Sequence, residues 1–96
     1  MSAKFKFSDN KIIIQGDINF ETVSAIYSEI ENYIISGNNI VIDFSETKEV
    51  NSAALALIIE LKKLANKSKV DIKFSKIPDK LLRLAEASNL VSDNFI

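Results

Sequence analysis

The chain has 96 residues, of which 47% are hydrophobic and 26% charged, and its formal net charge at pH 7 is −1. This length predicts one domain over residues 1–96, and the near-neutral charge gives no electrostatic drive toward nucleic acid or an anionic membrane. Cysteine and histidine are both absent, which excludes disulfides, thiol nucleophiles, histidine bases and thiolate or imidazole metal ligands.

The first third of the chain predicts two strands and a helix. Residues 4–8 (KFKFS) alternate as a half-buried strand does, and residues 11–15 (KIIIQ) form a β-branched run. We expect the two to pair as a hairpin that ends at Gly16-Asp17. A helix then follows from its N-cap Asn19 to a terminal glycine, Gly37. Its apolar residues recur at helical spacing: Phe20, Val23, Ile26, Tyr27, Ile30 and Ile34.

The rest of the chain alternates between strands and helices. The predicted elements are a buried strand at 39–44 (NIVIDF), a polar loop at 45–49, a helix from Ser52 to about Lys67, and a strand at 70–74 (VDIKF). Pro78 suits the first turn of a third helix, whose apolar face is Leu81, Leu82, Leu84 and Ala85. Residues 91–96 either add a short strand or pack on the core.

This β-β-α-β-α-β-α order predicts an α/β domain. The sheet is expected to be mostly parallel, with four to five strands and a hairpin at one edge. The strand at 39–44 is the only one apolar enough to be central. The strands at 4–8 and 70–74 each keep a polar side, so the helices should lie mainly on one face of the sheet.

The helix that begins at Ser52 has apolar residues on two sides. With an advance of about 100° per residue, its core face consists of Ala53, Ala54, Leu57, Ile58, Leu61, Leu64 and Ala65. Leu55, Ala56 and Ile59 fall on the other side, where polar residues are expected. Either they lie under a loop or at the margin of the core, or they form an apolar patch for another protein, with Lys62 and Lys63 on its polar rim.

Ser52 has two candidate roles. Asn51 or Ser52 caps the helix by accepting hydrogen bonds from its free N–H groups, and we expect capping to be the first role of the serine. A helix N-terminus also tolerates negative charge, so Ser52 is a candidate phosphorylation site. A phosphate there would weaken a hydrophobic contact at the neighbouring patch.

Three segments together resemble the STAS family. Residues 41–45 (VIDFS) and 50–57 (VNSAALAL) are similar to its strand, loop and helix signature, and residues 16–23 (GDINFETV) are similar to the start of its first helix. The resemblance extends over about the whole chain and implies a STAS fold. Asn51 and Ala54 stand where the family usually has aspartate and glycine.

Two branches of the family are candidates. One consists of anti-sigma-factor antagonists, in which a partner kinase phosphorylates the serine at the position of Ser52. The other consists of STAS subunits of ABC transporters that move phospholipid and maintain outer-membrane lipid asymmetry. The short chain, the run at 54–57 (ALAL), Ala65 and the Ile77-Pro78 step before LLRLA favour the transporter branch. Asn51 adds no negative charge for a kinase to recognise, which argues against phosphorylation.

The resemblance implies that the chain is a non-catalytic subunit that binds and supports the cytoplasmic ATPase subunit of such a transporter. The alternative is an antagonist that an anti-sigma-factor kinase regulates through Ser52. The residues expected to bind the partner are Ser52, Leu55, Ala56, Ile59, Lys62 and Lys63. A small-molecule site at the strand ends is a further alternative.

Catalysis and membrane insertion are not expected. Carboxylates such as Asp43 are present, but the chain has no glycine-rich phosphate loop, metal cluster or Ser-His-Asp set. The expected role of Asp43 is to cap the loop that follows it. The N-terminal residues lack the apolar region of a signal peptide, so we expect a cytoplasmic domain with no cofactor, held at the inner membrane only through its partner.

Overall fold

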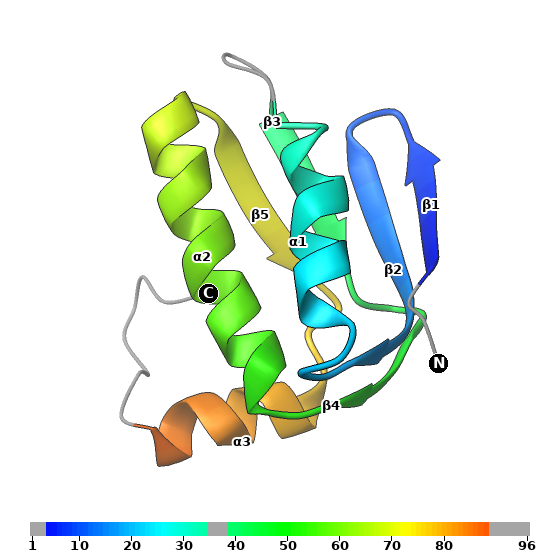
Figure 1. The fold of residues 1–96 in the computed structure, drawn as a ribbon, viewed down its shortest axis with the longest axis vertical. Helices are drawn as coiled ribbons and strands as arrows, with labels where there is room; N and C mark the ends of the chain where they lie inside the picture. The colour runs from blue at the N-terminus through cyan, green and yellow to red at the C-terminus, as the bar shows by residue number, and fades with distance from the viewer. Residues whose placement is uncertain (1–3, 35–38, 89–96) are drawn as a thin grey trace.

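The computed structural model describes residues 4–34 and 39–88. Within these ranges the elements are β1 (Lys4–Ser8), β2 (Lys11–Ile18), α1 (Val23–Glu31), β3 (Asn39–Asp43), β4 (Thr47–Val50), α2 (Ser52–Ser68), β5 (Asp71–Ser75) and α3 (Asp79–Ala87). The sheet has the strand order β1-β2-β3-β5, and β4 pairs with β2 outside this path (Figure 1). The predicted α/β class with a mostly parallel sheet is confirmed, with one strand more than the predicted order.

The sheet is built around two internal strands. β1 pairs antiparallel with β2 at one edge, as the predicted hairpin requires, and β2, β3 and β5 are parallel to one another. The expectation that β3 alone is central is wrong, because β2 also lies between two strands. Its buried isoleucines Ile12, Ile14 and Ile18 alternate along one face of the strand and contribute to the core.

The predicted end of β2 at Gly16-Asp17 is also wrong. The strand continues to Ile18, and a shift in its pairing with β4 falls between Gly16 and Ile18. Gly16 has φ 96°, a conformation that a side chain disfavours, and such an irregularity bends a strand. β4 lies in the segment predicted as a polar loop. The sequence could not indicate a strand here, because Val50 is the only buried residue of β4 and the segment has no alternation of buried and exposed residues.

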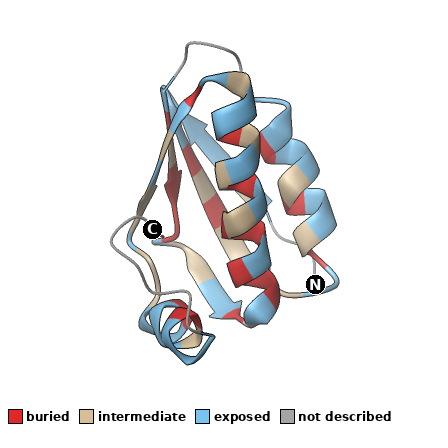
Figure 2. Ribbon diagram, turned by 90° about the vertical axis from the view of Figure 1, so that its left-hand side faces the viewer, coloured by how far each residue is buried: buried red, intermediate tan, exposed pale blue. Residues whose placement is uncertain are grey.

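α1 and α2 lie side by side on one face of the sheet, while α3 crosses the lower end of the domain next to the start of α2 (Figure 1). This confirms that the helices cover mainly one face. Figure 2 shows buried residues where α1 and α2 meet the sheet. The core combines alternate residues of β2 and β3 with the predicted core face of α2, of which only Leu64 is half-buried rather than buried.

The first helix begins later than predicted. Asn19 does not cap α1; its side-chain Oδ1 accepts hydrogen bonds from the N–H groups of Glu21 and Thr22 at 2.9 and 3.1 Å. It therefore closes a turn before the helix, and Phe20 in that turn is 71% exposed rather than on the apolar face. On α3, Leu82 is likewise exposed. The predictions for Gly37 and residues 91–96 lie outside the described residues.

Candidate functional site

The start of α2 is fixed by backbone and side-chain hydrogen bonds of Asn51. Its N–H donates to the carbonyl of Ile18 at 3.2 Å, which ties α2 to the end of β2. Its Oδ1 accepts from the N–H of Ala53 at 2.8 Å, so Asn51 is the N-cap. The expectation that Ser52 acts first as a cap is therefore wrong. Ser52 is exposed, and within the described ranges no hydrogen bond involves its hydroxyl.

The second apolar side of α2 divides into a buried and an exposed part. Leu55 is 5% exposed and belongs to the same buried cluster as Leu81 and Ala85 of α3. The prediction that Leu55 lies on an exposed patch is wrong. α3 packs against α2, and Leu55 is buried in the core that residues of both helices share. The angular position of a residue on one helix does not take a second helix into account. For Leu55, the alternative of a place at the core margin is the correct one.

The exposed part forms a narrow line along α2. Ser52, Ala56 and Lys63 are exposed and Ile59 is half-buried; we call these four residues the α2 stripe. Their spacing of four, three and four residues places them on one side of the helix. Lys62, the other predicted rim residue, is half-buried beside the stripe. The structure thus brings together the predicted site residues, with the exception of Leu55.

A groove of about 370 Å³ runs between α1 and α2 next to the stripe. Its walls are Val23, Ser24, Tyr27 and Ser28 of α1 and Ala56, Leu57 and Glu60 of α2; we call it the α1–α2 groove. Ala56 belongs to both surfaces, so the groove and the stripe are continuous. The contribution of α1 was not predicted from the sequence, because the helical spacing places Val23 and Tyr27 on the core face. The available signal was the small side chains of Ser24, Ser28 and Ala56, which leave space between facing helices.

The α1–α2 groove is electronegative at one position. Burial raises the pKa of the Tyr27 hydroxyl above its ordinary value, and the negative charges of Glu31 and Glu60 raise it further. Among the described residues that line the groove, Glu60 is the one with a formal charge. The groove therefore combines apolar walls, an aromatic ring and a carboxylate.

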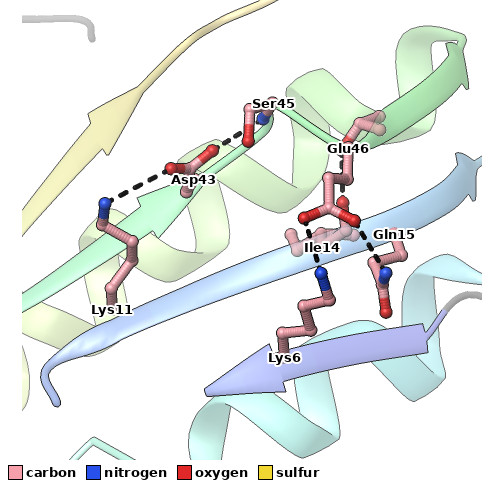
Figure 3. A network of polar contacts seen from close by, with 8 residues as sticks. Lys6, Lys11, Ile14, Gln15, Asp43, Ser45 and Glu46 are labelled. Atoms are coloured by element: carbon pink, nitrogen blue, oxygen red, sulfur yellow. Dashed lines mark hydrogen bonds and ion pairs between the residues drawn. The ribbon is translucent and has the colours of Figure 1, made fainter. Parts of the chain in front are cut away.

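Polar contacts at the ends of β2 and β3 hold the loop that leads toward α2 (Figure 3). Asp43 Oδ1 accepts from the N–H of Ser45 at 2.7 Å, and Lys11 Nζ lies 3.7 Å from Asp43 Oδ2. Burial alone would raise the pKa of Asp43, but the hydrogen bonds from Ser45 and the charge of Lys11 outweigh it and lower the pKa. The expectation that Asp43 caps the following loop is confirmed.

A second carboxylate in the same loop is held in a similar way. Glu46 accepts from Gln15 Nε2 at 2.8 Å and pairs with Lys6 Nζ at 3.1 Å. The hydrogen bonds from Gln15 and Lys6 lower the pKa of Glu46. Asp43 and Glu46 are thus occupied in positioning the loop before β4. Across the described ranges there is no cluster of three or more metal-ligating side chains, and no described helix is long and apolar enough to span a membrane.

Comparisons with known proteins identify relatives of this fold. The family model described as "Mlab, STAS domain" matches residues 1–92, whereas a search of the curated proteins gives no match. The structure of the anti-sigma factor antagonist SpoIIAA in its unphosphorylated form is similar with a TM-score of 0.64 and 11% identity, over 88% of this chain and 81% of that one. The crystal structure of Mglu is similar with a TM-score of 0.57 and 16% identity, over 80% of this chain but 20% of that one.

Proposed function

The chain belongs to the STAS family, and from this we propose that it is a non-catalytic subunit of an ABC-type phospholipid transporter that maintains outer-membrane lipid asymmetry. In this role it binds the cytoplasmic ATPase subunit and supports its activity. The name of the matching family model, Mlab, supports this branch of the family over the antagonists. The observation that carries the proposal is the exposed α2 stripe at the start of a helix that hydrogen bonds anchor to the sheet.

The α2 stripe has the composition of a small protein-binding surface. Ala56 and Ile59 form its apolar centre, and the hydroxyl of Ser52 and the charge of Lys63 lie at its ends, with Lys62 beside it. An apolar centre with a polar rim is the usual arrangement of protein interfaces. Leu55 contributes indirectly, because it packs in the core beneath this surface.

Co-purification of this chain with the ATPase subunit of the transporter tests the proposal. Ala56→Arg places a bulky charged side chain in the centre of the interface, and the lost packing together with the buried charge should weaken binding roughly tenfold or more. Ala87→Arg is the matched control, because Ala87 is an exposed helical alanine on α3 outside the stripe. Both variants should keep the thermal midpoint of the wild type.

The proposal fails if the wild-type chain and the ATPase do not associate. It also fails if Ala56→Arg and Ala87→Arg both bind as tightly as the wild type. A loss of binding with both variants would locate the contact elsewhere and contradict the assignment to the α2 stripe.

A second candidate is an anti-sigma-factor antagonist that a kinase regulates at Ser52. One observation favours it: the hydroxyl of Ser52 is exposed at a helix N-terminus and is not used for capping, so a phosphate could be added without loss of the cap. Intact-mass measurement after incubation with the kinase encoded nearest to this chain tests it. One added phosphate that disappears in Ser52→Ala would support the antagonist; an unchanged mass would exclude it.

A further inference from the structure

We propose that the α1–α2 groove receives a lysine or arginine side chain of the protein that docks on the α2 stripe. This inference rests on the proposed function, since it names what the ATPase subunit contributes to the contact. It assigns a role to α1, whereas the partner-binding residues expected from the sequence all lie on α2.

The shape and lining of the groove suit a long side chain with a charged end. Val23, Ala56 and Leu57 provide apolar walls, along which lysine and arginine bury their methylene stems while the charged head stays polar. Tyr27 also lines the groove, and an aromatic ring can attract a cation. Ser24 and Ser28 add hydroxyl groups that can accept hydrogen bonds from an ammonium or guanidinium group.

The charges around the groove select a cation over an anion or a neutral group. Glu60 lines the groove, and Glu31 lies one turn after Tyr27 on α1 and acts on the same hydroxyl. No ion pair within the described ranges involves either carboxylate. Lys63 is the cation of the α2 stripe, but it does not line the groove. Both carboxylates are therefore available to a basic group from outside.

The position of the groove favours a protein as the source of the cation. Ala56 lies both in the centre of the α2 stripe and in the wall of the groove, so a partner on the stripe also covers the mouth of the groove. A basic side chain that enters from that partner gains a desolvated charge pair with Glu60. Complementary charges of this kind increase the specificity of an interface and the rate at which the two proteins associate.

Charge variants of Glu60 test the inference in a binding assay with the ATPase subunit. Glu60→Gln should weaken binding roughly fivefold and Glu60→Lys more than tenfold, because each removes or reverses an interfacial charge. The wild-type affinity should also decrease more steeply with NaCl concentration than that of Glu60→Gln. Glu29→Lys is the matched control, since Glu29 is an exposed α1 glutamate that does not line the groove.

The outcome separates this inference from the proposed function. If Ala56→Arg abolishes binding while Glu60→Lys binds like the wild type, the docking surface on the α2 stripe is supported and the insertion of a basic side chain into the groove is refuted. If Glu60→Lys and Glu29→Lys weaken binding equally, the effect comes from net charge, and the binding of a basic side chain in the groove is again refuted. If the wild-type chain does not bind the ATPase, the proposed function fails first.

A small probe tests the cation preference without any partner. Acetyl-arginine amide, titrated into the isotope-labelled wild-type chain, should shift the amide resonances of Val23, Ser24 and Tyr27. Acetyl-citrulline amide, which has nearly the same shape and no charge, should shift them much less. Equal shifts with the two probes, or none with either, would overturn the inference.

Discussion

Replacement of Leu55 by alanine distinguishes a core residue from a docking residue. Leu55 is 5% exposed, so the substitution removes three carbon atoms from an almost fully buried side chain. At about 0.8 kcal/mol per buried CH₂ group this loses about 2.4 kcal/mol, and the cavity that remains raises the expected loss to about 3 kcal/mol. For a domain of this size, each kcal/mol lowers the thermal midpoint by roughly 4–8 °C.

Urea unfolding followed by far-UV circular dichroism measures this loss. Ala56→Ser is the matched control on the adjacent exposed position, where a surface substitution should change the free energy of unfolding by less than about 0.5 kcal/mol. A loss below about 1 kcal/mol for Leu55→Ala would refute its place in the core and restore the exposed patch expected from the helix alone. If the larger loss is observed, reduced ATPase binding by Leu55 variants reports on folding rather than on contact.

Three further predictions concern the polar groups that hold the site in place. Asn51→Ala should lower the free energy of unfolding in urea by about 1 kcal/mol, because the N-cap acceptor is lost, whereas Asn51→Asp should keep the cap. The pKa of Asp43 is lowered in the folded protein, so its stabilisation is present above the ordinary value of 3.8 and is lost as the pH falls through the lower, folded value. Melting curves between neutral and acid pH should therefore show a steeper acid loss for the wild type than for Asp43→Asn; parallel curves would exclude this role. Thr22→Val removes a buried hydroxyl that donates to the carbonyl of Asp17 at 2.9 Å. Calorimetry should show that the free energy of unfolding falls by about 1–2 kcal/mol.

The STAS resemblance that the sequence analysis drew from three short segments is confirmed by the family match over residues 1–92. The position of the docking surface stays a prediction, but its composition has changed. Leu55 leaves it, Ala56 becomes its centre, and α1 joins it through the groove. The serine at position 52 keeps a free hydroxyl because its neighbour, Asn51, provides the cap.

The sequence by itself determined the features that depend on neighbours along the chain. The edge strand β1, the core face of α2 and the loop cap at Asp43 follow from the periods of strand and helix and from the short reach of an aspartate side chain. These patterns are local, so each could be read without knowledge of the other elements.

Only the tertiary structure decided the features that depend on two elements meeting. β4 pairs with β2 where the register of β2 shifts between Gly16 and Ile18. Only one of the four residues of β4 is buried, so its sequence has no strand pattern. Asn51 rather than Ser52 caps α2, and the N–H of the same residue bonds to Ile18 of β2. Leu55 is buried in the cluster that includes Leu81 and Ala85 of α3, whereas Ala56 is exposed in the wall of the groove between α1 and α2. Whether a residue is buried depends on the elements that pack around it in the tertiary structure. The periodicity within one helix does not indicate which elements these are.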